Sequence, residues 1–524
     1  MTWSELPKKL DLDLVLVVLL SVFALAPLTY PGFFQSHSGF WSVFNLFDLE
    51  SNLWGNLGWV PTEAVGYALL RGEGPLPYLL AEFLRWLGLG GVGAIKTVYA
   101  VGFVASGLGA YLLARELFGA RAGLVAAVVY LYLPYHLATV YVRGAFGEAW
   151  AFVLYPLILL CLEKYLHGGR WRWASGVVLL YTALALTNLG LAVLYALILL
   201  AYALLLGPSR RMKGRSALLL LTGVGLTLFL QVPAVLRNGL LIEKGGDFFE
   251  HFVYPFQLLS ASWGYGASVA GWEDTMPLQL GLVATGLTLL TAMLLPSSNG
   301  VRPALRKKAT FFVVAALAMV LMLLHPASFL WRVSLLSTML RYPWQLLALI
   351  GLVLSVASGA VVGMARQLAC LPWQAALVTL AILSSYGYLS PHFTDVQVGG
   401  SPVAVLGDEM ALLAYEREGP LLHGATVRLT LQWQCLQLME TDYTVFVHIV
   451  DTQGTIWGQR DAMPSDGERP TSSWGLGEIV KDQHELTIDV EGPREGYTVE
   501  IGVYVWETGE RLPLSGGGTA VILD

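Results

Sequence analysis

Charged residues are scarce in this chain. Of its 524 residues, 13% are charged and 56% are hydrophobic, and the mean hydropathy is +0.61. A soluble fold of this length does not need so much apolar sequence, so we expect most of the chain to lie in a membrane. Basic residues are also few, with 31 against 37 acidic ones, so no basic face is available for nucleic acid.

Cysteines and familiar catalytic motifs are almost absent as well. The three cysteines are Cys161, Cys370 and Cys435. The topology derived below leaves Cys435 alone in its compartment, so we expect neither a disulfide nor a cysteine metal site. The sequence contains no glycine-rich phosphate loop, nucleophile elbow, HExxH or CxxC motif. No organic cofactor is expected.

Long apolar segments are what the chain does contain. A helix needs about 20 apolar residues to cross a bilayer, and eleven segments approach that length. They lie near 12–30, 94–114, 121–140, 148–166, 173–187, 190–207, 216–236, 277–296, 309–325, 341–364 and 373–390. The first is expected to act as an uncleaved signal anchor. An odd number of spans predicts that the two termini lie on opposite sides.

The basic residues indicate the orientation. The short loops on the N-terminal side carry 16 of them, whereas the longer loops on the other side carry 7. Because positive residues concentrate on the cytoplasmic side, we expect a cytoplasmic N-terminus and an extracytoplasmic C-terminus. The first outer loop, 31–93, includes an amphipathic stretch, Pro75 to Leu89, that predicts a helix lying in the membrane interface.

The composition changes after Ser390. Three stretches alternate apolar and polar residues, and clusters of glycine, proline and aspartate separate them: 425–434, 443–449 and 497–505. This pattern is typical of an antiparallel β-sandwich. We therefore predict a helical membrane domain over residues 1–390 and an extracytoplasmic all-β sandwich over residues 391–524. Trp433, Trp474 and Trp506 of the sandwich would stack on sugars if exposed, and would otherwise pack in its core.

Several stretches together resemble a known family. They are PGFFQSHSG (31–39), the long block 107–152, HFVYPFQLLSASWGYG (251–266), YTVFVHIVD (443–451) and PTSSW (470–474). They are similar to bacterial polytopic proteins of GT-C-type glycosyltransferase architecture, often labelled 6-pyruvoyl-tetrahydropterin-synthase-related membrane proteins. The resemblance covers nearly the whole chain. It implies a GT-C-like arrangement of helices, a polyprenyl-phosphate-type sugar donor and an acceptor outside the cell.

The sequence departs from this family at three polar positions. Relatives tend to carry an acid after the first-loop histidine, His-Asn near 187–188, and Phe-Pro-Trp-Arg near 342–345. This chain has Ser38, Thr187 and Gln345 at the positions of the acid, the histidine and the arginine. The alternative to an enzyme is therefore a catalytically degenerate scaffold or accessory subunit of a membrane assembly, with the sandwich or the membrane surface binding a protein partner.

Two groups of residues are candidates for the chemistry. Sugar transfer needs a carboxylate that takes the proton of the acceptor and a cation that stabilises the departing phosphate. In the first outer loop Asp48 or Glu50 would be the base, beside His37 as a substrate contact; they could equally cap or solvate an interfacial helix. Glu148 with Arg143 is the other candidate, and a structural ion pair is the competing interpretation.

The remaining candidates lie in the other outer loops. Arg341 would bind a lipid phosphate or extend to the interface. Trp263 and Tyr265 would contact sugar or form part of an interfacial aromatic belt. The cluster Glu243, Lys244, Asp247, Glu250 and His251 could hold a divalent cation, although its spacing is not diagnostic and a mobile acidic lid is the competing interpretation. We thus predict a multi-pass protein of the bacterial cytoplasmic membrane that transfers a sugar from a lipid-linked donor.

Overall fold

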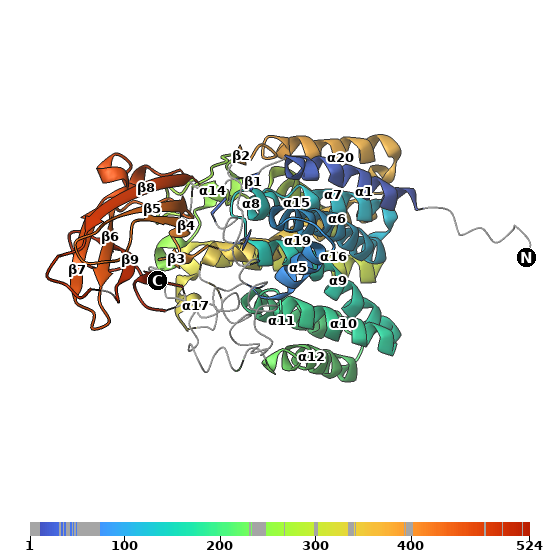
Figure 1. Ribbon diagram of the computed structural model, residues 1–524. Helices are drawn as coiled ribbons and strands as arrows, with labels where there is room; N and C mark the ends of the chain where they lie inside the picture. Colours follow the sequence, from blue (N-terminus) through green and yellow to red (C-terminus); the bar gives the residue numbers. More distant parts are fainter. Residues whose placement is uncertain are drawn as a thin grey trace, which may run out of the picture. The chain divides into compact units, whose positions relative to one another are not determined.

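The chain folds into two compact units (Figure 1). The computed structural model describes residues 11–30, 74–229, 248–266, 268–297, 302–333, 342–391, 402–475, 478–494, 496–515 and 517–523, with isolated positions between them. The first unit holds residues 1–31 and 49–391, and the second holds residues 32–48 and 392–524. Residues 32–48, which we had assigned to the first outer loop, therefore group with the C-terminal unit.

The first unit is helical. Its longer helices are α1 (Leu12–Leu25), α5 (Leu76–Trp86), α6 (Gly91–Phe118), α7 (Ala120–Leu131), α8 (Pro134–Tyr141), α9 (Phe146–Gly168), α10 (Trp171–Ala185), α11 (Leu189–Leu206), α12 (Arg210–Gly225), α15 (Leu282–Ser297), α16 (Pro303–Leu323), α19 (Leu347–Met364) and α20 (Leu371–Tyr386). Shorter turns are η1 (Ala26–Thr29), η2 (Phe248–His251), α14 (Pro255–Leu259), η3 (His325–Ala327), α17 (Ser328–Val333), η4 (Pro343–Leu346) and η5 (Arg366–Ala369).

Each predicted span coincides with one or two of these helices, which confirms a helical membrane architecture. In the described part of the chain, five helices are long and apolar enough to cross a membrane, or six if the bent pair α7–α8 is one span. Helices α15 and α20 are apolar but shorter. The number of eleven spans therefore stays a prediction.

The bend between α7 and α8 has a local cause. The two helices meet at 42° across Tyr132 and Leu133, and Pro134 opens α8. A residue before proline is pushed out of the helical region, and Leu133 is accordingly extended, with ψ of 129°. We predicted one continuous span over 121–140; the proline explains the break, which gives α8 its own direction.

The helix α5 lies where an amphipathic stretch was predicted. Phe83 and Trp86 are 55% and 75% exposed, whereas Glu82 is buried and pairs with Arg85 at 3.3 Å. Its start is fixed by Gly74, whose N–H donates to the Thr187 carbonyl at 2.7 Å. A side chain at Gly74 would place Cβ 2.0 Å from the Leu186 carbonyl oxygen, so only glycine fits there.

The second unit is an antiparallel β-sandwich, as predicted. One sheet has the order β3-β4-β5-β8, formed by β3 (Ala404–Leu406), β4 (Met410–Glu418), β5 (Thr426–Cys435) and β8 (Ile479–Thr487). The other has the order β10-β9-β6-β7, formed by β6 (Tyr443–Val450), β7 (Ile456–Ala462), β9 (Thr498–Val505) and β10 (Val521–Leu523). A small pair joins β1 (Phe33–Phe34) to β2 (Phe393–Thr394), and short turns η6 (Pro464–Gly467) and η7 (Thr471–Ser473) complete the unit.

The sandwich core follows the predicted alternation. On β5, Val427, Leu429, Leu431 and Trp433 are buried, and they pack with alternate residues of β6 and β9. Trp433 is fully buried and Trp474 is 1% exposed, whereas Trp506 is 64% exposed. Trp433 and Trp474 therefore pack in the core. Of the three tryptophans, Trp506 alone is exposed enough to stack on a sugar.

Close packing of α19 against α7 generates a test of the fold. A Cβ at Gly359 would lie 2.6 Å from the Ala122 carbonyl oxygen and 2.9 Å from the Ala126 Cβ. Because backbone must move to make room, Gly359→Ala should lower the free energy of unfolding by about 1–3 kcal/mol. Gly286→Ala on α15 is the matched control, since it meets open space. In detergent, Gly359→Ala should have a clearly lower unfolding temperature than Gly286→Ala. Equal unfolding temperatures would contradict the close packing of α19 against α7.

Candidate functional site

Arg143 and Glu148 are brought together by the turn that joins α8 to α9. The Arg143 N–H donates to the Ala138 carbonyl at 2.8 Å, which tightens the end of α8. Gly144 then adopts a positive φ of 63°, and α9 begins at Phe146, with Glu148 in its first turn. A carboxylate is favourable there because the helix N-terminus carries partial positive charge.

The two side chains form a buried ion pair that Tyr135 completes. Arg143 Nη1 lies 2.6 Å from Glu148 Oε2, and the side chains are 11% and 4% exposed. The Tyr135 hydroxyl donates to Glu148 Oε1 at 2.7 Å and accepts from Arg143 Nη1 at 2.8 Å. Both carboxylate oxygens are therefore engaged. An apolar helix bundle tolerates a buried charge when that charge has both a counter-charge and hydrogen-bond partners, as this pair has.

Trp344 extends this cluster towards a different loop. The Arg143 guanidinium carbon lies 4.7 Å from the centre of the Trp344 ring, a cation–π distance. Trp344 belongs to η4, just before α19, and its ring stacks on Tyr342 at 5.1 Å. Its indole N–H donates to the Ser268 hydroxyl at 3.1 Å. The charged pair is thus connected to the loop that follows α14.

Ser268 joins two titratable residues of that loop. Its hydroxyl donates to Asp274 Oδ2 at 2.6 Å and lies 3.0 Å from His251 Nδ1. A hydroxyl group has one hydrogen to donate, and Ser268 donates it to Asp274. The Ser268 oxygen must therefore accept hydrogen bonds from both Trp344 and His251. This network assigns the hydrogen of His251 to Nδ1. These contacts connect seven residues into one array: Arg143, Glu148, Tyr135, Trp344, Ser268, Asp274 and His251.

Asp274 is the carboxylate of this array that has no arginine partner among the described residues. Its Oδ1 accepts from the Met276 N–H at 2.8 Å. Burial raises the pKa of Asp274 above its ordinary value, and the hydrogen bonds from Ser268 and from the Met276 backbone oppose the shift. A carboxylate with a raised pKa is a better proton acceptor near neutral pH than a free one.

The predicted site residues are only partly described. Glu148 and Arg143 meet as an ion pair, which was the competing interpretation for them. Asp48, Glu50 and Arg341 lie outside the described residues, as do Glu243, Lys244 and Asp247 of the predicted cation cluster. His37 is half-buried and groups with the second unit.

Trp263 and Tyr265 pack against the segment after α20. The Trp263 ring stacks on Tyr388 at 4.4 Å and 11°, and the Tyr265 hydroxyl donates to the Ser390 carbonyl. The Trp263 indole N–H is buried and has no hydrogen-bond partner in the described part of the chain. One face of Trp263 is therefore occupied, and its N–H remains a donor that a ligand or water could use.

Four residues of the array escaped the sequence analysis as individual candidates: Tyr135, Ser268, Asp274 and Trp344. Tyr135 lies within the block 107–152 that carried the resemblance, and Trp344 lies in the segment where Gln345 departs from it. Ser268 and Asp274 belong to no recognisable spacing. The clue that was available for Asp274 is the rarity of acids in this chain, since a lone carboxylate in an aromatic, apolar loop needs a partner.

Two of the three departures from the family pattern have local structural roles, and the third, Ser38, lies outside the described residues. Gln345 Oε1 accepts from the Tyr342 N–H at 3.1 Å, which closes the η4 turn. Thr187 is buried and donates to the Ala183 carbonyl at 2.7 Å, and Asn188 Oδ1 caps α11 by accepting from Leu191 N–H at 2.9 Å. Gln345 and Thr187 thus stabilise turns at positions where relatives tend to carry basic side chains.

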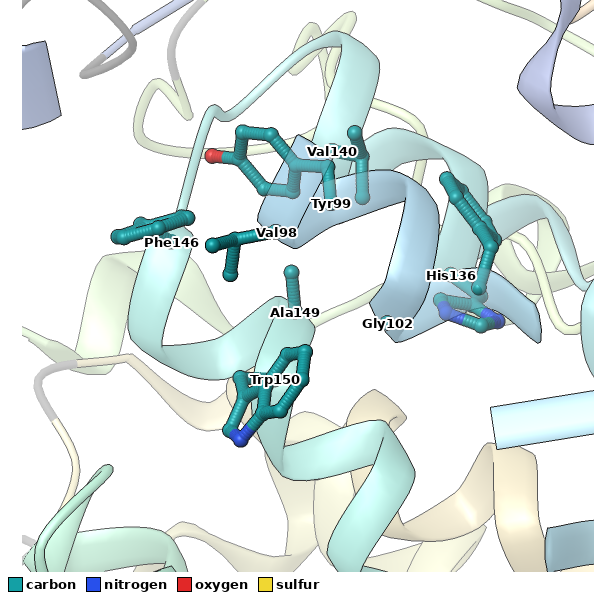
Figure 2. A pocket seen from close by; sticks show the side chains of 9 residues that line it. Val98, Tyr99, Gly102, His136, Val140, Phe146, Ala149 and Trp150 are labelled. Carbon is teal, nitrogen blue, oxygen red and sulfur yellow. The ribbon is translucent and has the colours of Figure 1, made fainter. Parts of the chain in front are cut away.

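Two small pockets flank His136 on α8. Figure 2 shows the first, with Val98, Tyr99 and Gly102 from α6, His136 and Val140 from α8, and Phe146, Ala149 and Trp150 from α9. The second includes Tyr135, Gln279 and apolar residues of α19. His136 Nδ1 lies 3.0 Å from the Tyr130 carbonyl, and its ring stacks on Phe152 at 4.1 Å. Both pockets are lined mainly by apolar side chains and by no lysine or arginine, so neither has the cationic groups that would bind a phosphate.

Metal binding finds no support in the residues described. No group of three or more histidine, cysteine, aspartate or glutamate side chains among them could hold an ion. Glu243 and Asp247 of the predicted cation cluster lie outside the described residues. The divalent cation therefore stays a prediction.

The comparisons with known proteins agree on the type of fold. The sequence model of a family described as dolichyl-phosphate-mannose-protein mannosyltransferase matches residues 74–236. The structure of the arabinofuranosyltransferase AftD from Mycobacteria is similar with a TM-score of 0.51 and 18% identity, over 74% of this chain and 27% of AftD. This chain thus spans about a quarter of AftD. No curated protein matches it in sequence.

Two further solved structures match with lower scores. ArnT from Cupriavidus metallidurans bound to undecaprenyl phosphate has a TM-score of 0.34 and 15% identity, over 72% of this chain and 89% of ArnT. The Archaeoglobus fulgidus oligosaccharyltransferase has a TM-score of 0.36 and 16% identity, over 74% of this chain and 54% of that one. The resemblance to GT-C-type membrane proteins is confirmed by the family model and, at the level of fold, by AftD.

The buried ion pair generates a stability test. Glu148→Gln should lower the free energy of unfolding by about 3–5 kcal/mol, because it leaves the buried Arg143 charge without its counter-charge. Glu116→Gln is the control, since Glu116 pairs with Lys164 at 2.5 Å with 40% of its side chain exposed, and such pairs contribute about 0–1 kcal/mol. The double variant Arg143→Met, Glu148→Gln should recover much of the loss. Equal unfolding temperatures of Glu148→Gln and Glu116→Gln would contradict a buried, coupled pair.

Proposed function

We propose that this chain, whose fold is of the GT-C type, is a membrane glycosyltransferase that moves a sugar from a polyprenyl-phosphate-type donor to an extracytoplasmic acceptor. The observation that carries the proposal is the array around Arg143 and Glu148. Its charged pair lies within residues 74–236, which match a mannosyltransferase family, and the array joins three separate segments of the helical unit.

The proposed reaction needs one negatively charged and one positively charged group near the membrane surface. The acceptor hydroxyl oxygen attacks the anomeric carbon, the bond from that carbon to the phosphate oxygen breaks, and the phosphate leaves with the electron pair. A carboxylate takes the hydroxyl proton, and a cation stabilises the charge on the leaving phosphate. The array contains both kinds of group, in Asp274 and Glu148 on one side and Arg143 on the other.

The contacts suggest a division of roles. Glu148 has both oxygens occupied and is 4% exposed, so we assign it to positioning Arg143. Arg143 is the proposed phosphate partner, because guanidinium binds phosphate with several donors in one plane. Asp274 is the described carboxylate best suited to accept a proton, and it joins Asp48 and Glu50 as a candidate base. Arg341 would be a second phosphate partner, with His37, Trp263 and Tyr265 as substrate contacts.

The proposed location follows from charge. The uneven distribution of basic residues supports a cytoplasmic N-terminus, an extracytoplasmic sandwich and a site at the outer membrane surface. A lipid-linked donor fits this location because its prenyl chain would remain in the bilayer while the sugar phosphate reaches the loops. The partner of the protein would then be a membrane lipid, and the acceptor a glycan, lipid or protein outside the cytoplasm.

A non-catalytic scaffold is the alternative that specific contacts favour. Glu148 and Arg143 compensate each other, and Gln345 and Thr187 hold turns at positions where relatives tend to carry basic side chains. A descendant that lost its chemistry would retain such an arrangement for stability. It would act by binding a protein partner in a membrane assembly.

Turnover separates the two functions. Purified protein in lipid, supplied with a panel of polyprenyl-phosphate sugars, should release or transfer sugar, and Glu148→Gln should reduce kcat/KM at least about 100-fold per folded molecule, since misplaced charge costs transition-state stabilisation. Glu116→Gln should match the wild type. No turnover and no donor binding across the panel would favour the scaffold and direct attention to co-purifying proteins.

The pH dependence tests the role of Asp274. The Ser268 hydroxyl holds the pKa of Asp274 down against burial, so Ser268→Ala should raise that pKa further. If the Asp274 carboxylate must be ionised to act as a base, the acid limb of the kcat/KM profile should move to higher pH, with the plateau above it less affected. Ser260→Ala is the control, because Ser260 hydrogen-bonds to Ser262 in the same loop. If the kcat/KM profiles of the wild type and of Ser268→Ala superimpose over pH, Asp274 is not the catalytic base.

A further inference from the structure

The sheet β10-β9-β6-β7 has a second packed layer on the side away from the sandwich core. On β6, Val445, Val447 and Ile449 belong to the core. The alternating residues Phe446 and His448 must therefore face the opposite way. In the register of the sheet, Phe446 lies between Asp461 on β7 and Gly502 on β9. These residues occupy the outer face of the sandwich unit.

This outer layer is fixed by contacts rather than open to solvent. Phe446 and His448 are only 1% and 8% exposed. The Arg511 guanidinium carbon lies 4.3 Å from the centre of the Phe446 ring, and a Cβ at Gly502 would come 2.3 Å from that ring. Gly502 is therefore required for Phe446 to lie across the sheet.

Asp461 is oriented by two neighbours. The Tyr504 hydroxyl donates to Asp461 Oδ2 at 3.1 Å, and His448 Nε2 lies 3.1 Å from Asp461 Oδ1. The Asp461 side chain nevertheless remains 29% exposed. A carboxylate held in one rotamer at the surface loses little conformational entropy when it binds a further donor.

Trp506 adds an exposed aromatic surface next to Tyr504, the residue that donates to Asp461. Its ring centre lies 6.2 Å from that of Tyr504, at an interplanar angle of 33°. Trp506 is 64% exposed, whereas Trp433 and Trp474 of the same unit are in the core. Exposing a tryptophan is costly in apolar surface, so an indole that adjoins oriented polar groups indicates a binding surface.

We propose that Trp506, Tyr504, Asp461 and Arg511 form a saccharide-binding site on the outer face of this sheet. The Trp506 ring would pack on the C–H face of a sugar ring, the Asp461 carboxylate would accept from neighbouring hydroxyls, and the Arg511 guanidinium would donate to ring or hydroxyl oxygens. Asp461 accepts from Tyr504 and lies in hydrogen-bond distance of His448, and the Arg511 guanidinium lies over Phe446 on the same face, which also carries Glu500. Because this face offers both donors and acceptors and has no excess of positive charge for an anionic ligand, the ligand class we propose is a neutral oligosaccharide. The site is separate from the proposed transfer chemistry and can be tested without turnover.

A protein partner fits this surface less well. A stable protein interface buries at least about 1,000 Å² with a continuous apolar centre. In the described part of this sheet, the other large exposed apolar residues are Ile522 on β10 and Ile456 on β7, which are the two edge strands. Trp506, Ile522 and Ile456 are thus dispersed among polar side chains. One aromatic ring with two charged hydrogen-bonding groups matches the size of a sugar unit rather than of a protein surface.

The experiment measures binding to the full-length chain in detergent by isothermal titration calorimetry. The probes are soluble oligosaccharides of glucose, mannose, arabinose and N-acetylglucosamine. At least one should bind, and Trp506→Ala should weaken it by at least about tenfold, which corresponds to about 1.4 kcal/mol. Trp506→Phe should retain part of the affinity because a ring remains for stacking. Asp461→Asn should also weaken binding.

Ile522→Ala is the matched control, because Ile522 is on the outer face of the same sheet and is also 64% exposed. It should bind the probe like the wild type. The unfolding temperature of each variant shows that the sandwich remains folded. The proposal is overturned if the wild type binds none of the probes, or if Trp506→Ala and Ile522→Ala bind equally well.

Discussion

The cost of burying charge in an apolar bundle determines where the polar residues of the membrane unit lie. Its described buried acids all have a basic partner: Asp13 with Arg121, Glu82 with Arg85, Glu148 with Arg143, and Glu163 with Lys308. Without such a partner each carboxylate would have to be neutralised or leave the interior. Two of these pairs join separate helices, one lies within α5, and one closes the turn between α8 and α9.

Arg143–Glu148 differs from the other pairs in what surrounds it. Asp13–Arg121 ties α1 to α7, and Glu163–Lys308 ties α9 to α16. Arg143 instead contacts an aromatic ring, Trp344, whose N–H continues to a serine of another loop. Glu163 also has further partners, since the Tyr202 hydroxyl donates to its Oε2 and His167 lies 3.4 Å from its Oε1. The Arg143 cluster differs in continuing into the loop that follows α14. Compensation of buried charge thus produces contacts between helices at Asp13 and Glu163, a pair within one helix at Glu82, and a connected polar array at Glu148.

The helices and the sandwich could be predicted because hydropathy and alternation are local properties. The apolar segments and the strand alternation around Trp433 follow from burial alone. The break at Leu133 was also present in the sequence, as Pro134, but a hydropathy window averages over it. The Ser268–Asp274 contact could not be predicted, since short polar residues in an irregular loop carry no periodicity. Only the fold shows that Trp344, Ser268 and His251 meet.

Surface exposure is another property that sequence does not settle. Trp433 and Trp506 both adjoin strands with alternating residues, and the alternation places Trp433 in the core. Trp506 comes directly after Val505, at the end of β9, where the chain turns. Its orientation depends on where the strand ends relative to the core, and strand ends are the least predictable part of such patterns.

The burial of Glu148 and its two hydrogen bonds limit the role that it could have in the proposed reaction. A base must have an oxygen lone pair that the acceptor hydroxyl can reach. Each oxygen of Glu148 already accepts one hydrogen bond, Oε1 from Tyr135 and Oε2 from Arg143, and the side chain is only 4% exposed, so its remaining lone pairs are poorly accessible. If Glu148 left Arg143 to act as a base, an unpaired guanidinium would remain in the bundle until a phosphate replaced the carboxylate. Catalysis by this array therefore requires either a phosphate that competes for Arg143, or a base supplied by another carboxylate. Asp274, linked to Arg143 through Ser268 and Trp344, is the described residue that meets the second requirement without breaking the ion pair.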